Sequence, residues 1–155
     1  MAHLYTATVA WARGEGDDFA RGRYTRDHEW RFDGGISVPA SASALVVPKA
    51  YVGDATVDPE EAFIASLASC HMLTFLDVAR RAGFVIDTYD DDATGEMAKT
   101  PEGRYWISAV TLHPRIVWVD REPSHEELAR LHHQAHDLCF IANSVKTAVT
   151  VEGFR

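Results

Sequence analysis

The two cysteines are the residues whose chemistry bears most directly on function. Cys70 stands within the stretch DPEEAFIASLASCHMLTFL (58–76), and Cys139 follows 69 positions later in CFIANS. A thiolate is a nucleophile, a metal ligand and half of a disulfide, whereas a buried thiol can simply act as a small hydrophobic group. The two residues could therefore be inert core residues, metal ligands or a redox pair.

A reactive thiol needs a nearby cation, because only the thiolate attacks and a guanidinium group lowers the thiol pKa. Strand alternation in the segment 23–35 places Arg26 on the same face as the bulky side chains of that segment, and Arg23 on the other face. We expect the bulky face to point inward. An inward arginine needs a partner, since an isolated buried charge costs several kcal/mol. Of the candidates Arg21, Arg23, Arg26 and Arg31, Arg26 is therefore the better functional candidate, and a structural ion pair is the alternative explanation for an inward arginine.

Glu60 is the carboxylate that the sequence offers to this arginine. Asp58 and Glu61 are engaged in a predicted capping box, which leaves Glu60 available in the first helical turn. It could equally be there to favour the helix dipole. In a continuous helix, Glu60 and Cys70 are separated by about 15 Å along the axis. A site that uses both residues would then need a second copy of the chain.

A histidine-rich segment, LHHQAHDLC, offers a different chemistry. His132, His136 and Cys139 are spaced at i, i+4 and i+7, which places them on one face of a helix. Zinc accepts imidazole and thiolate ligands, and Cys70 or His71 could supply a fourth. The chain has no HExxH glutamate, and the histidines could simply line a half-exposed face. The acidic cluster DTYDDD (87–92) is interpreted as a solvated loop in preference to a cation site.

Two helices and several strands must position these residues. The first helix begins with Asp58 as N-cap and Pro59 at its first position, and should run to about Ala82, before the stop signal Gly83. It is apolar nearly all round, so it belongs in the middle of the fold. The second helix begins after Ser124, with Glu127 completing a capping box, and should end near Asn143.

Six segments have the alternation or turn boundaries of extended structure: 3–11, 23–35, 36–48, 84–97, 104–119 and 145–154. The turn KTPEG should join the fourth and fifth segments as a hairpin. The order of elements predicts an α+β fold with antiparallel sheets around a buried central helix. We see no linker, so residues 1–155 are expected to form a single domain.

Length and charge exclude several classes of protein. A chain of 155 residues suits one packed domain. Its formal charge of -8 argues against nucleic-acid binding, which favours a basic face. No apolar run approaches the ~20 residues that span a bilayer, so we expect no membrane association. The first residues show no signal-peptide pattern, so we expect a cytoplasmic protein with reduced thiols.

The motif DPEEAFIASLASC together with the second cysteine resembles the OsmC/Ohr family of thiol-dependent peroxidases. In that family a reactive cysteine follows a Pro-Glu helix start, and a second cysteine lies about 65 residues later on another helix. The resemblance covers most of the chain. It implies an OsmC-like fold and an intertwined homodimer with two sites at the interface.

The resemblance also implies roles for individual residues. Cys70 would be the peroxidatic thiolate, Cys139 the resolving thiol, Arg26 the catalytic arginine and Glu60 the residue that orients it. The reaction would reduce organic hydroperoxides, and more weakly hydrogen peroxide, through a sulfenic acid and a Cys70–Cys139 disulfide. An external dithiol would reduce the disulfide, and no metal, haem or flavin would be required.

Two other readings stay open from the sequence. The chain could be a non-catalytic member of the same fold that binds a small apolar ligand. It could also be a zinc-binding protein that uses His132, His136 and Cys139. The functions of His28 and His71 are left undecided between tuning the site and packing.

Overall fold

The computed structural model describes residues 3–153 and divides the chain into two compact units, with the boundary between Ala62 and Phe63. The boundary falls in the first turn of α1 (Pro59–Arg81), which is continuous. Each unit is described by itself below. That residues 1–155 form a single domain stays a prediction.

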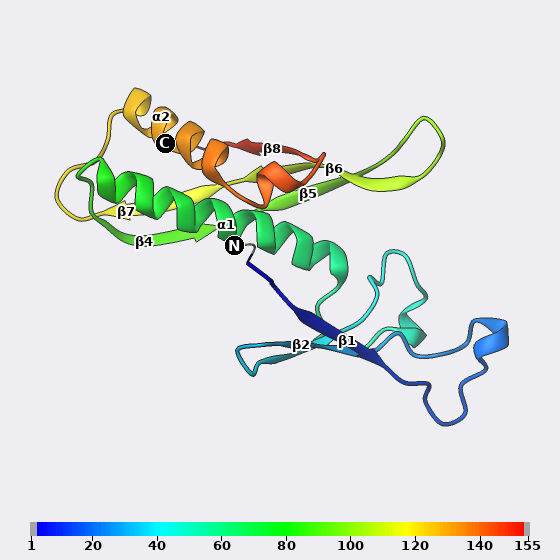
Figure 1. The fold of residues 1–155 in the computed structure, drawn as a ribbon. Coiled ribbons are helices and arrows are strands. Elements are labelled where there is room, and N and C mark those ends of the chain that lie inside the picture. Colours follow the sequence, from blue (N-terminus) through cyan, green and yellow to red (C-terminus); the bar gives the residue numbers. More distant parts are fainter. Residues whose placement is uncertain (1–2, 154–155) are drawn as a thin grey trace. The chain divides into compact units, whose positions relative to one another are not determined.

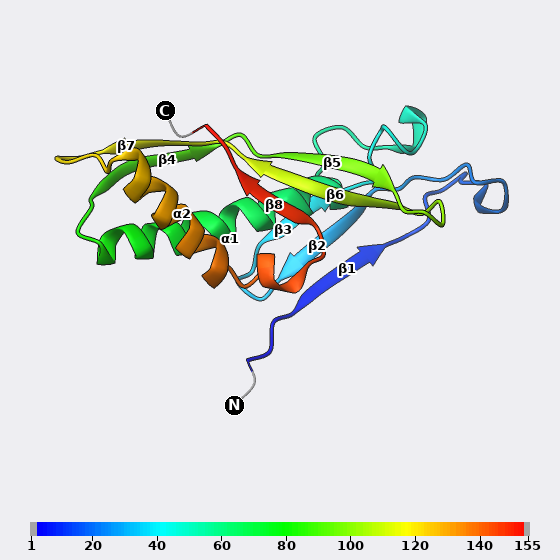
Figure 2. The same ribbon diagram turned by 90° about the horizontal axis from the view of Figure 1, so that it is seen from above.

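Unit 1 contains a three-stranded antiparallel sheet in the order β1-β2-β3 (Figures 1 and 2). The strands are β1 (Ala7–Trp11), β2 (His28–Phe32) and β3 (Ser37–Ala40), with the short 3-10 helices η1 (Phe19–Arg21) and η2 (Lys49–Tyr51) in the loops. All three are shorter than expected. Residues 23–27 do not belong to β2, so strand alternation does not decide where the side chain of Arg26 points.

The turn between β2 and β3 has the glycine that the sequence predicts. Gly35 adopts a φ of 80°, which a residue with a Cβ atom rarely tolerates, and its N–H donates to the carbonyl of Phe32 over 3.0 Å. The turn aligns Trp30 with Val9 on β1 and with Val38 on β3. The inner strand of unit 1 is thereby paired on both edges.

The predicted helix start is confirmed in atomic detail. The N–H of Glu61 donates to Oδ1 of Asp58 over 2.8 Å, and the N–H of Asp58 donates to Oε2 of Glu61 over 3.1 Å. This reciprocal capping box satisfies two of the backbone donors that a helix start leaves open. The helix ends at Arg81, and Gly83 follows with a φ of 84°, as the stop signal indicated.

Unit 2 holds the remaining strands in two sheets (Figure 1). They are β4 (Ile86–Asp91), β5 (Thr94–Lys99), β6 (Tyr105–Leu112), β7 (Pro114–Trp118) and β8 (Ala148–Val151). β4 pairs with β7, and the second sheet has the order β5-β6-β8, in which β8 runs parallel to β6. The other pairs are antiparallel, so the predicted α+β class with mainly antiparallel sheets is confirmed. Phe154, the last residue of the predicted final strand, lies outside the described residues.

Each of the two long strands expected in this unit is broken into two. The break has a visible cause, because the carboxylate of Asp91 accepts the backbone N–H of His113 over 2.7 Å and so takes that donor out of the ladder. Asp91 and Pro114 close the β4–β7 pairing, and Thr94 and Thr111 open the next sheet. The acidic cluster 87–92 therefore lies largely in β4, not in a solvated loop. It terminates a ladder, and Asp92 forms an ion pair with Arg115.

The second helix, α2 (His125–Leu138), starts as predicted and ends earlier than predicted. Ser124 and Glu127 form the expected capping box. The helix stops at Leu138, and Cys139 is its C-cap with an extended ψ of 112°. The 3-10 helix η3 (Ala142–Ser144) follows. Cys139 consequently sits at the end of α2 and not within it.

Both helices contribute to the hydrophobic core of unit 2. One cluster joins α1 and α2 through the buried residues Phe75, Val78, Ala79, Phe84, Leu131 and Ala135, and partly buried residues of β4 and β7 pack against it. A second cluster centres on Leu67 of α1 with Val110 and Leu112 of β6. Burying these apolar side chains supplies the main driving force for holding α1 in place, at about 25 cal/mol per Å² of apolar surface.

The helix α1 corrects one expectation from the sequence. It is long and apolar enough, by length and composition alone, to cross a membrane, with a mean hydropathy of 1.6 over its best window. Its buried residues nevertheless belong to the two core clusters of unit 2, so α1 packs as a core helix of that unit. Other positions are open to solvent in the single chain, and Leu73 is 61% exposed.

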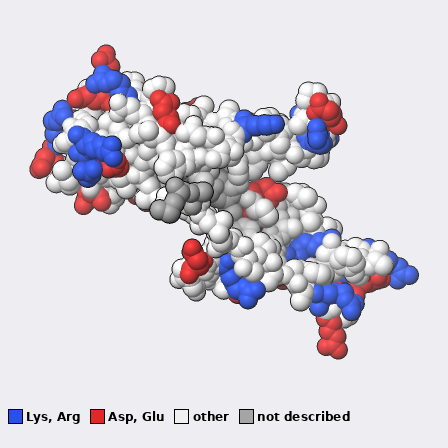
Figure 3. Space-filling view, viewed as in Figure 1, with Lys and Arg blue, Asp and Glu red and all other residues white. Residues whose placement is uncertain are grey.

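Positive and negative side chains are interspersed on the molecular face drawn in Figure 3. In unit 2, for example, Asp77 forms ion pairs with both Arg80 and Arg81 at the end of α1. Such neutralised pairs among the described residues do not create the continuous basic surface that a nucleic-acid backbone requires.

Candidate active site

The structure brings the two cysteines of unit 2 together. Cys70 is half-buried in α1, and Cys139 is 1% exposed at the end of α2. Both are free thiols, and Cys70 lies near enough to Cys139 to raise the pKa of the Cys139 thiol. Two neighbouring thiols are candidates for a disulfide. That they form a redox pair remains a prediction.

Cys139 has the surroundings of a thiol that stays protonated. Burial raises the pKa of Cys139 above its usual value, and the hydrogen bond and charge of Cys70 raise it further. Backbone N–H groups of the following turn lower the pKa of Cys139, and the backbone nitrogen of Ala142 lies 3.4 Å from Sγ of Cys139. Burial prevails, so a neutral Cys139 thiol faces Cys70. A neutral thiol is a weaker nucleophile than a thiolate, so Cys139 is not expected to be the residue that attacks a peroxide.

A buried pair of histidines lies beside this contact, and the sequence analysis did not foresee it. Nε2 of His71 and Nδ1 of His132 are 3.0 Å apart, and the two side chains are 1% and 2% exposed. Burial lowers the pKa of His71 to about 4 and that of His132 to about 3, so both rings are neutral at neutral pH. The i, i+4 spacing had suggested a metal site for His132. The position of His132 instead belongs to the face of α2 that points into the core.

Among the described residues, the geometry does not supply the group of ligands that the zinc hypothesis requires. Among residues 3–153, no group of three or more His, Cys, Asp or Glu side chains is arranged to hold a metal ion. His132 is directed to His71, and Cys139 to Cys70. The residues that the sequence grouped on one helical face thus contact different partners.

Arg26 lies in unit 1, in the loop before β2. Its guanidinium stacks on the ring of Tyr24, with Cζ 3.5 Å from the ring centroid. Its Nη1 donates to the carbonyl oxygens of Tyr24, over 2.5 Å, and Gly22, over 3.2 Å. Carbonyl groups and an aromatic face therefore provide the compensation that was expected from a carboxylate.

The other residues predicted around this arginine are not joined to it. No ion pair among the described residues involves Arg26 or Glu60, and Glu60 is half-buried in the first turn of α1. Arg23 is exposed and bridges through its backbone to Asp18. The predicted pairing of Glu60 with Arg26 is therefore not formed within unit 1 of this structure, and the catalytic roles of both residues stay predictions.

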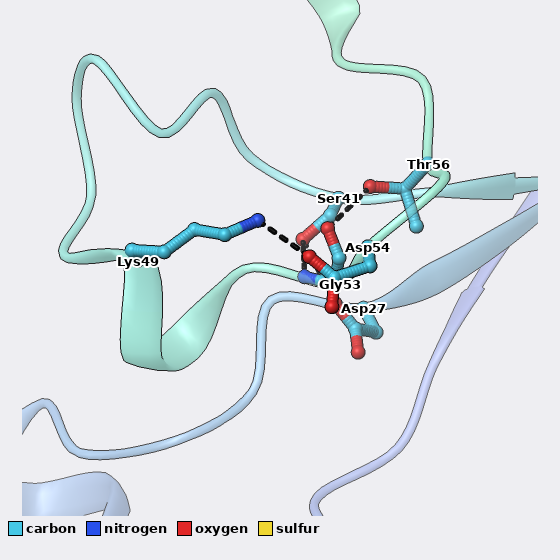
Figure 4. Close-up of polar contacts among 6 residues, drawn as sticks. All are labelled: Asp27, Ser41, Lys49, Gly53, Asp54 and Thr56. Carbon is cyan, nitrogen blue, oxygen red and sulfur yellow. Dashed lines mark hydrogen bonds and ion pairs between the residues drawn. The ribbon is translucent and has the colours of Figure 1, made fainter.

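Polar contacts around the buried Ser41 fix the segment that carries Arg26 (Figure 4). The hydroxyl of Ser41, which is fully buried, donates to Oδ1 of Asp27 over 2.9 Å and accepts the N–H of Gly53 over 3.3 Å. A Cβ atom on Gly53 would approach Oδ1 of Asp27 to 2.6 Å, so the close fit requires glycine. The N–H of Arg26 also donates to the carbonyl of Tyr51 over 2.9 Å.

His28 contributes to the same segment through its ring. Nδ1 of His28 lies 2.8 Å from the carbonyl oxygen of Arg26, and because that oxygen only accepts, Nδ1 carries the hydrogen. The ring thus clamps the main chain of Arg26 in addition to packing near Trp30.

An apolar pocket opens beside Arg26 within unit 1. Its volume is about 490 Å³, and it is lined by Val9, Trp11, Phe19, Tyr24, Arg26, His28, Ser41, Ala42 and Pro59. Three of the aromatic rings form a cluster, with centroid distances of 4.6 Å between Phe19 and Tyr24 and 5.7 Å between Trp11 and Tyr24. A single cation in a mostly apolar pocket suits a small organic molecule with one polar group.

The comparisons with known proteins agree with this architecture. The model of the OsmC-like protein family matches residues 52–153. An OsmC-like protein of unknown function from Vibrio cholerae is 42% identical in sequence, with coverage of 99% of this chain and 100% of that chain and a TM-score of 0.94. No curated protein matches the sequence.

Two more distant structures share the fold. An organic hydroperoxide resistance protein, OsmC, from Legionella pneumophila is 20% identical, with coverage of 97% of this chain and 99% of that chain and a TM-score of 0.67. The organic hydroperoxide resistance protein OhrB of Bacillus subtilis is 21% identical, with coverage of 97% and 98% and a TM-score of 0.65. Together with the family model, these similarities confirm the fold and the resemblance expected from the sequence: the chain belongs to the family of OsmC-like proteins.

Proposed function

We propose that this protein is a thiol-dependent peroxidase that reduces organic hydroperoxides, and more weakly hydrogen peroxide, with Cys70 as the attacking residue. The observation that carries the proposal is the contact between the two thiols, of which Cys139 is buried and kept protonated. Membership of the OsmC-like family supports it, as do the folds of organic hydroperoxide resistance proteins.

The proposed cycle has three balanced steps. The thiolate of Cys70 attacks one oxygen of the hydroperoxide, the O–O bond breaks, and an alkoxide leaves and takes up a proton to become the alcohol. Cys70 is then a sulfenic acid. The thiol of Cys139 attacks its sulfur, and water and a Cys70–Cys139 disulfide result. An external dithiol reduces this disulfide by thiol–disulfide exchange and is itself oxidised. The cycle uses no metal, haem or flavin.

Arg26 and Glu60 complete the proposal. Arg26 would stabilise the thiolate and polarise the peroxide oxygens, and Glu60 would orient Arg26 in the complete site. The apolar pocket beside Arg26 would receive the organic group of the hydroperoxide, which favours organic peroxides over hydrogen peroxide. Arg23 is the alternative arginine, but its exposed side chain makes it the weaker choice.

The working form would be a homodimer in the cytoplasm. Because α1 is continuous, the ten residues between Glu60 and Cys70 correspond to about 15 Å, too far for both to meet one substrate. A second copy would supply one of the two residues. The exposure of Leu73 on this apolar helix in the single chain is what a subunit interface would cover.

Thiol mass spectrometry tests the proposal directly. The reduced protein is treated with one equivalent of cumene hydroperoxide, and we expect one intramolecular Cys70–Cys139 disulfide per chain. In Cys139→Ser the product should stop at oxidised Cys70, whereas Cys70→Ser should not react and should not support peroxide-dependent consumption of dithiothreitol. If the wild-type protein has the same free thiols after treatment as before, the proposal is refuted.

A second candidate is a non-catalytic protein of the same fold that binds a small apolar ligand. The aromatic pocket of unit 1 is the observation in its favour, because it exists independently of the cysteines. This candidate predicts ligand binding that Cys70→Ser leaves intact and that Tyr24→Ala weakens. The peroxidase proposal predicts in addition a reaction that Cys70→Ser abolishes.

A further inference from the structure

The His71–His132 pair is a direct link between the two helices that carry the cysteines. His71 belongs to α1 and His132 to α2, and their ring nitrogens are 3.0 Å apart. The rings are nearly parallel, with an interplanar angle of 8° and centroids 5.3 Å apart. Phe75 stacks on His132 at a centroid distance of 4.1 Å. The contact is therefore buried, tightly packed and polar.

The position of the pair along the helices connects it with the thiols. His71 directly follows Cys70, and His132 precedes Cys139 by seven residues, which is about two helical turns. A displacement of α2 along α1 would carry Cys139 with it. The packing of Phe75 and Ala79 against Leu131 and Ala135 is apolar and has no preferred direction. A hydrogen bond, in contrast, tolerates only a few tenths of an ångström.

One imidazole must donate and the other accept for this bond to form. With both rings neutral, each has one N–H and one bare nitrogen, so the bond between Nε2 of His71 and Nδ1 of His132 uses one of each. Breaking this hydrogen bond would deprive one buried nitrogen on each ring of its partner, which costs free energy. Any other register of the two helices is therefore less stable. The pair therefore selects one register.

We propose that the His71–His132 hydrogen bond is a positioning device that sets the thiol of Cys139 against that of Cys70 and so determines how readily their disulfide forms. In this role the histidines act through the helices that carry the two cysteines. The inference rests on the proposed function, because it assigns the pair a part in the resolving step. Its consequence can be measured without a peroxide.

The measurement is the equilibrium between the protein and glutathione. Two protein thiols and one oxidised glutathione give the protein disulfide and two reduced glutathione molecules, and the equilibrium constant gives the effective concentration of one thiol at the other. His132→Leu removes the bond at similar volume. We expect the effective concentration to fall at least about tenfold, which corresponds to the loss of roughly one hydrogen bond.

A restoring variant and a matched control separate positioning from general packing. In the double variant His71→Gln and His132→Asn, the amide groups can occupy the places of Nε2 and Nδ1, so the effective concentration should return to near the wild-type value. His133→Leu alters the neighbouring residue of α2, whose side chain is 77% exposed, and should change nothing. Should His132→Leu fail to fold, His132→Gln, whose amide lies away from the position of Nδ1, takes its place.

Two results would overturn the inference. One is a wild-type effective concentration in folded His132→Leu, or in His132→Gln where that takes its place. The other is an effective concentration in the double amide variant as low as in that single variant. The proposed function fails differently. If cumene hydroperoxide leaves Cys70 reduced in every variant, the peroxidase is excluded while the glutathione equilibrium still reports on the pair. If the peroxidase is correct, excess hydroperoxide should overoxidise Cys70 to a sulfinic acid more extensively in His132→Leu than in wild type.

Discussion

The buried histidine pair makes the folded protein sensitive to mild acid, and the size of the effect follows from the structure. In the unfolded chain His71 and His132 take up protons near pH 6.5, whereas in the folded chain burial lowers the pKa values to about 4 and about 3. Above pH 6.5 both states hold neutral rings, so the pair does not affect the pH dependence. As the pH falls below 6.5, the unfolded state binds protons that the folded state cannot, and stability decreases.

The magnitude at pH 5 can be worked out. That pH is 1.5 units below the unfolded pKa of 6.5, so each histidine lowers the free energy of unfolding by about 2 kcal/mol and the pair by about 4 kcal/mol. A total stability of about 5–15 kcal/mol makes this a substantial fraction. Carboxylates with lowered pKa values, such as Asp77 and Glu127, also lose stabilising interactions in acid, but below about pH 4. Burial raises the pKa of Asp91, so the histidine contribution is isolated by comparison with a variant that lacks both histidines and keeps Asp91.

Urea unfolding at pH 7.0, 6.0 and 5.0, at one protein concentration, measures the effect. The variant with His71→Gln and His132→Asn has no titrating group at either position, so its free energy of unfolding should stay nearly constant over this range. His133→Leu should follow the wild-type curve, since the exposed ring of His133 does not belong to the pair. Equal pH dependence in the wild type and the amide variant would refute the assignment of acid sensitivity to this pair.

Further substitutions test single contacts of the fold and the site. Ser41→Ala removes the hydrogen bonds to Asp27 and Gly53, so the free energy of unfolding in urea should fall by about 1–3 kcal/mol. We also expect a lower kcat/KM for cumene hydroperoxide. Ser37→Ala, on the exposed edge, should match wild type in both measurements. Gly95→Ala would bring a Cβ atom to 2.5 Å from Cδ1 of Ile64, and overpacking of this kind should lower the unfolding free energy by about 1–3 kcal/mol; a neutral result would show that the helix can shift freely. Ser124→Ala removes the capping box of α2 and should cost about 1 kcal/mol, with the exposed Ser37→Ala again as the comparison. Leu73→Lys places a charge on the exposed apolar side of α1 and should convert a dimer into monomers in light scattering; an unchanged mass would remove Leu73 from the interface.

The elements whose signals are local could be predicted closely. The capping residues Asp58 and Ser124 are recognised from short spacings because a helix start is satisfied by its own neighbours. Gly83 is recognised as a stop for the same reason. The hairpin turn between β5 and β6 also closes locally, with the N–H of Gly103 donating to the carbonyl of Thr100 over 2.8 Å.

Features that depend on distant residues were missed. The division of the long strands needs the side chain of Asp91 to meet the N–H of His113, 22 positions away, and no periodicity within either strand reveals it. The parallel pairing of β8 with β6 likewise depends on the path of the chain around α2. The alternation argument for Arg26 assumed a strand that begins only at His28, so its conclusion about that side chain had no structural basis.

The histidines show why residue types and spacing alone could not identify their role. A face with His132, His136 and Cys139 fits a zinc site and a buried helix face equally well, because the helical period is the same for both. The deciding fact is the partner: His71 occupies the corresponding place on α1, and its Nε2 meets Nδ1 of His132 without a metal between them. The sequence placed Cys70 and His71 side by side, and the fold directs one to Cys139 and the other to His132. Two adjacent residues of one helix thus interact with two different residues of the segment 132–139. This double interaction makes the distance between the sulfurs depend on the pair of histidine rings.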